Sequence, residues 1–370
     1  MTIVGTRPEL IKMSRVICEF DKYTKHVLVH TGQNYDYELN QVFFDELQIR
    51  KPDYFLGAAG SNAAQTIAQI ISKSDEVLEQ EKPDAVLLYG DTNSCLAVIS
   101  AKRRKIPIFH MEAGNRCFDQ VVPEELNRKI VDHLSDINLV LTEHARRYLM
   151  SEGIPPQSII KTGSHMNEVI DFYKPCIKKS KILETLGLTA KKYFVVSIHR
   201  EENVDDPSNL ECIMKVLDNI ADRYGFPIVV STHPRTRIRL ESFKDRKINS
   251  LILFLKPFGF FDYIKLQTES FCVVSDSGTV TEEAALLGFP AITIRQSHER
   301  PEGMDAGILI MSGILPNNVL DAINVVTSQK SKFLNEIEVV DYDVKNVAQK
   351  ILRIVLSYTE YVNRIIWRKY

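Results

Sequence analysis

Short apolar runs rich in β-branched residues alternate with longer amphipathic segments along the chain, and this alternation constrains the fold most. We expect a short first strand just before Gly5 and further strands at 26–30, 85–89, 108–111, 137–141, 159–161, 194–198, 228–232, 251–255, 272–275 and 291–294. Most of these runs are apolar on both faces, which is typical of parallel strands that helices cover on both sides. The sequence therefore predicts an α/β fold in which helices connect parallel strands.

The length of 370 residues fits two domains of similar size. The segment 172–182 holds a proline and several lysines, interrupts the pattern, and is interpreted as a hinge. We expect one doubly wound domain over 1–171, a second over 183–343, and a last helix over 344–370 that crosses back onto the first. Such domains face a central cleft and bind ligands at the carboxyl ends of their strands.

Composition and charge argue against several classes of protein. The 46 Lys and Arg nearly balance the 48 Asp and Glu, so nucleic acid is not an expected partner. No apolar run is long enough to cross a membrane, and no secretory signal is visible. The six cysteines are scattered without a Cys-x-x-Cys pair, which is typical of a reducing cytosol. We expect a cytoplasmic protein that needs neither a metal ion nor a cofactor.

Polar side chains follow the predicted strands of the first half, at the end where α/β proteins bind ligands. In the turn at 5–12, Arg7 and Lys12 can face an anion at a helix N-terminus, although a solvated turn is the alternative. Asp91 follows the next strand, where an aspartate also suits a helix cap.

Two further carboxylates belong to the same group. Glu112 ends a strand, where a charge is costly without a partner, and Glu124 opens a helix, where it also favours the helix dipole. We expect Asp91, Glu112 and Glu124 to converge on one rim. Grouped carboxylates without metal-ligand spacing suit proton transfer at carbon, because mutual repulsion raises a carboxyl pKa toward neutrality.

The second half supplies candidate anion donors. His199 and Arg200 follow one predicted strand, and His233 follows the next. The turn of Ser277 and Gly278 leads into a helix and suits a diphosphate, which its backbone N–H groups can bind.

The helix after this turn carries further candidates. Thr279 and Glu282 have the spacing of a capping box, which would leave Glu283 to hold a ribose. Tyr263 lies in an aromatic segment that suits either a nucleotide base or the core.

Taken in order, these motifs resemble the non-hydrolysing UDP-N-acetylglucosamine 2-epimerase family. The motifs are GTRPE-x-IK (5–12), GDT (90–92), H-x-EAG (110–114), PEE-x-NR (123–128), HRE (199–201), H-P-x-x-R (233–237), DSG-x-x-x-EEA (276–284) and ERPE (299–302). The resemblance implies two Rossmann-like domains in a GT-B type arrangement, a UDP-sugar in the cleft, and a homodimer.

Within the family, the chain is similar to the branch that forms UDP-N-acetyl-L-fucosamine from UDP-2-acetamido-2,6-dideoxy-L-talose for capsule or O-antigen. The similar segments are 31–40, 112–120, 277–279 and 297–304. UDP-N-acetylglucosamine enzymes have a second glycine where this chain has Thr279, a threonine at the place of His298, and a longer loop before Pro123.

Several other activities remain open at this stage. The main alternative is a UDP-N-acetylglucosamine 2-epimerase that forms UDP-N-acetylmannosamine. A hydrolysing epimerase, a glycosyltransferase of the same fold, and a non-catalytic nucleotide-sugar-binding protein are further alternatives.

The resemblance also implies a mechanism, in which UDP leaves by elimination across C1–C2 and adds back to a 2-acetamidoglucal-type intermediate with C2 inverted. It assigns catalysis to Asp91, Glu112, Glu124 and His199. It assigns substrate binding to Arg7, Lys12, Arg200, His233, Tyr263, Ser277, Gly278, Glu283, His298 and Arg300. Family members that a second substrate molecule activates carry Gln-His-Arg-Gln where residues 33–36 keep only the first Gln, so we do not expect that activation here.

Overall fold

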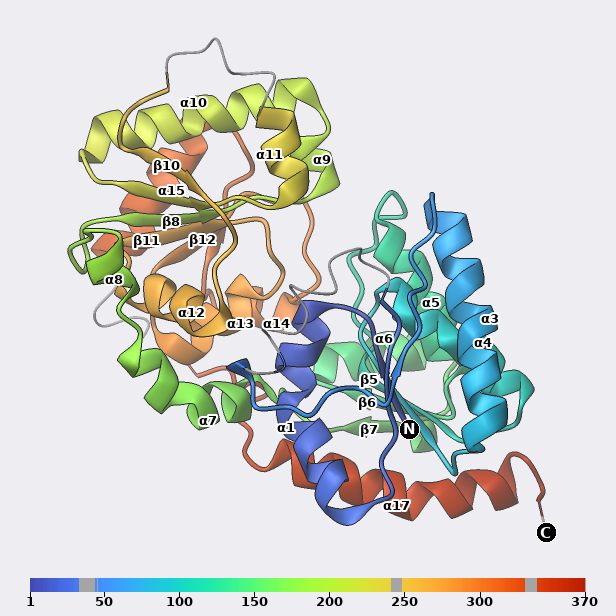
Figure 1. Ribbon diagram of the computed structural model, residues 1–370. Helices are drawn as coiled ribbons and strands as arrows, with labels where there is room; N and C mark the ends of the chain where they lie inside the picture. Colours follow the sequence, from blue (N-terminus) through green and yellow to red (C-terminus); the bar gives the residue numbers. More distant parts are fainter. Residues whose placement is uncertain (33–43, 45, 241–247, 330–337, 370) are drawn as a thin grey trace. The chain divides into compact units, whose positions relative to one another are not determined.

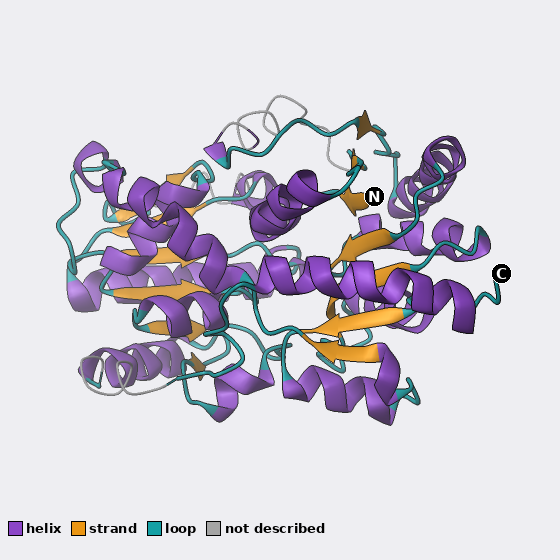
Figure 2. Ribbon diagram, turned by 90° about the horizontal axis from the view of Figure 1, so that it is seen from below, coloured by secondary structure: helices purple, strands orange, loops and turns teal. Residues whose placement is uncertain are grey.

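A computed structural model of the chain describes residues 1–32, 44, 46–240, 248–329 and 338–369. They form two compact units: unit 1 is Met1–Val169 with Asp341–Tyr370, and unit 2 is Ile170–Val340. The end of the chain thus belongs to the unit in which the chain begins. Each unit is a parallel sheet with helices on both faces (Figure 2). The expected α/β fold is confirmed.

Unit 1 contains, within its described residues, a seven-stranded sheet of order β3-β2-β1-β4-β5-β6-β7. Its strands are β1 (Thr2–Val4), β2 (Leu28–His30), β3 (Tyr54–Phe55), β4 (Val86–Tyr89), β5 (Ile108–Ala113), β6 (Ile137–Val140) and β7 (Ile159–Lys161). Its helices are α1 (Arg7–Tyr23), α3 (Ala63–Glu81), η1 (Asn93–Ala97), α4 (Val98–Arg103), α5 (Pro123–Leu134), α6 (Glu143–Ser151), η2 (Pro156–Ser158) and α17 (Val347–Ile365).

The two faces of the unit 1 sheet are covered by different helices. On one face, Ile3, Leu88 and Ile108 of the strands pack with Ile70 and Leu78 of α3. On the other, the last helix α17 packs along α1 (Figure 1). Helix α7 (Met166–Lys179) connects unit 1 to unit 2. It includes Pro175 and most of the segment 172–182, so the expected hinge is largely helical.

Unit 2 contains, in the described part of the chain, a six-stranded sheet of order β10-β9-β8-β11-β12-β13. Its strands are β8 (Phe194–Ser197), β9 (Ile228–Ser231), β10 (Ile252–Leu255), β11 (Cys272–Ser275), β12 (Ala291–Thr293) and β13 (Ile310–Met311). Its helices are α8 (Ile182–Thr185), α9 (Glu201–Val204), α10 (Pro207–Tyr224), α11 (Pro234–Leu240), α12 (Phe260–Glu269), α13 (Val280–Leu287), α14 (Pro301–Asp305) and α15 (Pro316–Ser328).

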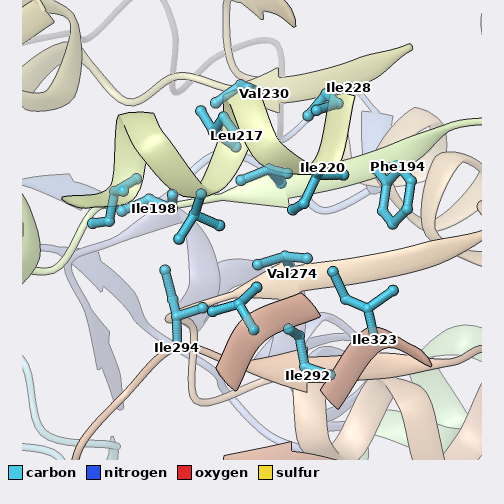
Figure 3. Close-up of a cluster of buried hydrophobic side chains, with 14 of the residues drawn as sticks. Phe194, Ile198, Leu217, Ile220, Ile228, Val230, Val274, Ile292, Ile294 and Ile323 are labelled. Carbon is cyan, nitrogen blue, oxygen red and sulfur yellow. The ribbon is translucent and has the colours of Figure 1, made fainter. Parts of the chain in front are cut away.

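Alternate residues of each central strand of unit 2 enter two different cores. Val274 of β11 joins Leu217 of α10 and Ile323 of α15 in one core (Figure 3). Its neighbour Val273 packs on the other face, with Ala284 of α13. Both faces are buried, which is why the strands are apolar at nearly every position.

Both sheets reverse their strand order beside their first strand. In unit 1, β1 lies between β2 and β4, and in unit 2, β8 lies between β9 and β11. The crevice at such a reversal is the usual ligand site of doubly wound sheets. The segments that follow β1, β4, β5, β8 and β11 therefore position the candidate functional residues.

A substitution at Gly163 tests how the C-terminal segment that contains Val344 packs on the rest of unit 1. Gly163 has φ +81, and a Cβ there would overlap the Val344 side chain; Gly153 has φ +87 but open space around it. We expect Gly153→Ala to cost only backbone strain, about 1–2 kcal/mol, and Gly163→Ala about 1–3 kcal/mol more from overpacking. Urea unfolding followed through the single tryptophan, Trp367 of unit 1, measures both. Equal midpoints for the two variants would contradict this packing.

Candidate active site

The carboxylate of Glu9 accepts hydrogen bonds from the segments that follow β1 and β4, at the crevice of unit 1. Its side chain lies in the first turn of α1 and the residue is 2% exposed. The N–H of Gly5, after β1, donates to its Oε2 at 2.7 Å, while the hydroxyls of Thr92 and Ser94, after β4, donate to its carboxylate. Burial raises the pKa of Glu9 to about 7, although these hydrogen bonds act in the opposite direction. Glu9 is part of the motif GTRPE-x-IK but was not among the predicted site residues.

Arg128 fixes the predicted residue Asp91, which follows β4. The guanidinium contacts Asp91 Oδ2 through Nε at 2.8 Å and Nη2 at 2.7 Å. The amide of Asn127 donates to the backbone carbonyl of Asp91 at 2.9 Å. Both partners come from α5, so this helix sets the position of the Asp91 carboxylate.

Glu112 stands at an irregular point near the end of β5. Its φ is +62, and the pairing of β5 with β6 shifts register between Met111 and Ala113. Such a conformation costs a non-glycine residue roughly 1–3 kcal/mol and is frequent at functional sites. Lys12 contacts Oε2 of Glu112 at 3.1 Å, and the hydroxyl of Tyr89 donates to the same oxygen.

The two glutamates that open α5 differ in their surroundings. Glu125 is 1% exposed, pairs with Arg128 at 3.0 Å and accepts the Cys117 N–H at 3.1 Å. Glu124 is half-buried and has no hydrogen bond or ion pair with any residue that the structure describes. Glu125 therefore holds the loop before α5, whereas Glu124 is available to a ligand.

The three predicted acids do not form a bare cluster of like charges. Asp91 pairs with Arg128 and Glu112 with Lys12. The structure thus gives two of the acids cationic partners in place of the mutual repulsion that we expected. Burial does raise the pKa of another carboxyl, that of Glu9, whose hydrogen-bond partner Thr92 is the residue after Asp91.

Asp276 follows β11, and its carboxylate accepts hydrogen bonds from the segment that follows β8, at the crevice of unit 2. It is fully buried and accepts the backbone N–H groups of His199 and Arg200 at 3.1 and 3.0 Å and the amide of Asn203 at 3.0 Å. Burial alone would raise the pKa of Asp276, but the charge of His199 and these donors outweigh burial and lower the pKa.

The ring of His199 is held by Asp276 and still reaches the surface. Its Nδ1 lies 3.1 Å from Asp276 Oδ1, and 41% of the side chain is exposed. Burial would lower the pKa of His199, but the Asp276 carboxylate outweighs it, so the pKa is raised. The exposed His233 ring lies 6.3 Å from the His199 ring. Both rings can donate N–H groups to an anion, and the raised pKa of His199 favours a positive charge there.

The turn between β11 and α13 differs from the predicted capping box. Thr279 has φ −75 and ψ −20, and its side chain caps no backbone group. Its hydroxyl lies 3.0 Å from that of Ser277, and Glu282 lies 3.9 Å from Arg300. The prediction is wrong because an N-cap residue needs an extended backbone, which Thr279 lacks.

A buried group of charges lies against this turn. Glu299 contacts Arg200 at 3.1 Å and Arg295 at 2.5 Å. A Cβ at Gly278 would overlap the Glu299 carboxylate, so a larger residue there would displace this side chain. Arg295 is 3% exposed and was not among the predicted residues.

The remaining predicted residues occupy several environments. Glu283 is buried and accepts the Gln267 amide at 2.7 Å. Tyr263 is partly buried against the core of unit 2. His298 is half-buried, and burial together with the nearby Arg295 charge lowers its pKa. Arg7 is half-buried in the first turn of α1.

Two further properties concern metal ions and membranes. Within the described ranges, no three His, Cys, Asp or Glu side chains are grouped so as to hold a metal ion. No helix among the same residues has the length and apolarity needed to cross a membrane.

Glu9 gives a prediction about stability and pH. Its pKa is about 7 in the folded protein against an ordinary 4.5, so between these values the folded state binds more protons and stability falls as pH rises. We expect Glu9→Gln to gain up to about 3 kcal/mol relative to the parent between about pH 5 and about pH 8.

Trp367 fluorescence during urea unfolding, at several pH values, measures this gain. Glu19→Gln, which alters another buried glutamate of α1, is the matched control for the replacement of a buried carboxylate. A constant difference between Glu9→Gln and the parent at every pH would refute the raised pKa.

Comparison with known proteins identifies the family. A family model described as UDP-N-acetylglucosamine 2-epimerase matches residues 18–356. A solved UDP-N-acetylglucosamine 2-epimerase from Rickettsia bellii is 58% identical, with a TM-score of 0.93, over 100% of this chain and 99% of that one. The Methanocaldococcus jannaschii UDP-GlcNAc 2-epimerase, solved with UDP-GlcNAc and UDP, is 31% identical, with a TM-score of 0.89, over 96% and 99%.

A relative that is named for another sugar shows the same match. The UDP-2,3-diacetamido-2,3-dideoxy-D-glucuronate 2-epimerase of Pseudomonas aeruginosa is 33% identical over 329 residues, which are 87% of this chain and 89% of the relative. The match of the family model and these identities lead to one conclusion: the chain belongs to the UDP-N-acetylglucosamine 2-epimerase family and is an isomerase that acts on a UDP-sugar.

Proposed function

We propose that the enzyme converts UDP-2-acetamido-2,6-dideoxy-L-talose into UDP-N-acetyl-L-fucosamine by inverting C2. The names of the relatives support a common reaction with different sugars, since one acts on UDP-GlcNAc and another on a diacetamido uronate. The observation that best supports this chemistry is the position of Glu112. Its carboxylate is held by Lys12 and Asn115, and its backbone has an unfavourable positive φ.

The proposed reaction begins with removal of the C2 proton by a carboxylate of unit 1. The electron pair forms the C1–C2 double bond, the C1–O bond breaks, and UDP leaves with that bonding pair. UDP then adds back to C1, and an acid delivers a proton to the opposite face of C2. A weakly acidic C–H needs a positioned base, and Asp91, Glu112 and Glu124 are the candidates.

The departing diphosphate carries negative charge that the enzyme has to stabilise. We assign this task to Arg7, Lys12, His199 and Arg200, with donors from Ser277 and Gly278. In this proposal Tyr263 stacks on uracil, Glu283 binds the ribose, and His233, His298 and Arg300 complete the substrate site.

The choice of sugar rests on residues that contact the candidate groups. The Asn115 amide donates to Glu112 Oε1 at 3.2 Å, so a residue of the short loop before α5 contacts a candidate acid. Thr279 contacts Ser277 in the turn proposed to bind the diphosphate. The alternative, UDP-GlcNAc, is favoured by the name of the 58% identical relative from Rickettsia bellii.

A product assay distinguishes the two sugars. The purified enzyme is incubated with each UDP-sugar, and proton NMR of the anomeric region follows inversion at C2. We expect turnover of the L-talo sugar at a kcat/KM at least about tenfold above that of UDP-GlcNAc. The reverse preference would establish the alternative, and phosphorus NMR that shows UDP accumulating would indicate a hydrolysing enzyme.

Removing one carboxylate at a time tests the catalytic roles. We expect Asp91→Asn, Glu112→Gln and Glu124→Gln each to lower kcat by about 100-fold or more, because general acid–base catalysis contributes about that much. Calorimetric titration with UDP is expected to give an affinity near that of the parent. A variant with unchanged kcat would remove its residue from the mechanism.

Two further properties belong to this proposal. The family resemblance favours a homodimer, which analytical ultracentrifugation can measure. We also infer hyperbolic kinetics without activation by UDP-GlcNAc. The run at 33–36 on which this inference depends lies outside the described residues.

A further inference from the structure

We propose that Asp132 is a positioning residue that holds Glu112 in its reactive orientation. This inference rests on the proposed role of Glu112 in proton transfer. Asp132 lies on α5, its side chain is 0% exposed, and no motif of the sequence analysis includes it.

Asp132 binds the backbone and side chains on either side of Glu112. Its Oδ1 lies 2.8 Å from Nδ1 of His110, which precedes Glu112 in β5. Its Oδ2 accepts the N–H of Gly114 at 3.2 Å and a guanidinium N–H of Arg116 at 2.7 Å. One buried carboxylate therefore anchors the chain before and after the candidate acid.

The turn at Glu112 needs such an anchor. Glu112 has φ +62 and Gly114 has φ +79, so the chain leaves the regular strand at this point. A Cβ at Gly114 would overlap the carbonyl oxygen of Ala145, which shows how closely the turn packs on α6. An unfavourable backbone persists only where its surroundings hold it in place.

Through His110, Asp132 also influences the turn that carries Asp91. Nε2 of His110 lies 2.8 Å from the carbonyl oxygen of Gly90, the residue before Asp91. Asp132 thus acts through His110 on a second strand end. The spacing of the Asp91 and Glu112 turns depends on this buried chain of contacts.

The charge of Asp132 suits this role. Burial would raise the pKa of Asp132, but His110 and Arg116 outweigh burial and lower the pKa. Arg116 is itself fixed by Glu152 through two contacts of 2.7 Å. Asp132 therefore remains a carboxylate with three donors, and asparagine would place an amide against groups that donate.

Asp136 provides a matched control. It follows α5, is 3% exposed, accepts the Ile108 N–H at 2.9 Å and pairs with Lys102 at 2.6 Å. It therefore binds the same strand β5 in a similar way, but at the end away from Glu112. Asp136→Asn reports the structural cost of such a substitution without displacing the turn.

The experiment compares Asp132→Asn with Asp136→Asn in the full-length enzyme, at a temperature where both are folded. We expect both to lower the melting temperature. Only Asp132→Asn is expected to lower kcat, by about 100-fold with little change in KM, because a small misplacement of a catalytic group costs about that much. Its rate of deuterium exchange at C2 in D₂O should fall by the same factor.

The outcomes separate this inference from the proposed function. If Glu112→Gln is inactive while Asp132→Asn keeps the kcat of Asp136→Asn, the positioning role is overturned. If Glu112→Gln retains full kcat, the proposed function fails instead. If Asp132→Asn does not fold, His110→Gln, which removes only the ring contacts, takes its place: a kcat at least about tenfold lower supports the role, and the parent kcat overturns it.

Discussion

A buried carboxylate bridges the two diverging strand ends at the crevice of each sheet, and the rest of the site depends on this bridge. Glu9 does so in unit 1 and Asp276 in unit 2. Where strands diverge, backbone N–H groups lose their ladder partners, and a buried N–H without an acceptor is costly. The carboxylate supplies that acceptor, and it fixes the turns that carry Asp91 in one unit and His199 in the other.

The two bridges differ in charge, and this difference suits different tasks. Asp276 has His199 beside it, which lowers its pKa and leaves a charged pair where an anion can bind. Glu9 receives only hydroxyl and backbone donors, and burial raises its pKa. Around Glu9, the candidate acids Asp91 and Glu112 are held by Arg128 and Lys12, so their carboxylates are oriented before any substrate arrives.

The sequence predicted the fold class well because the central strands are buried on both faces and are therefore continuously apolar. It missed β3 (Tyr54–Phe55) and β13 (Ile310–Met311), edge strands of two residues that leave no periodic pattern. The Thr279 capping box failed because residue spacing does not encode backbone dihedral angles.

The catalytic and binding roles of the site residues stay predictions, and most of these residues could be chosen from the sequence because they belong to motifs at or near the ends of predicted strands. The residues that hold these side chains in place, Glu9, Asp132, Asp276 and Arg295, were not singled out. The partners of Glu9, Asp132 and Asp276 lie far along the chain, as Thr92 does from Glu9, and only the fold brings them together.

The claim that these oriented acids expel UDP by breaking the C1–O bond can be tested directly by isotope exchange. The substrate is prepared with ¹⁸O in the oxygen that joins C1 to the β-phosphorus, and phosphorus NMR follows the label during epimerisation. The account predicts that ¹⁸O appears in the non-bridging oxygens of the β-phosphate as the sugar inverts. Complete inversion at C2 with all the label still in the bridge would contradict it.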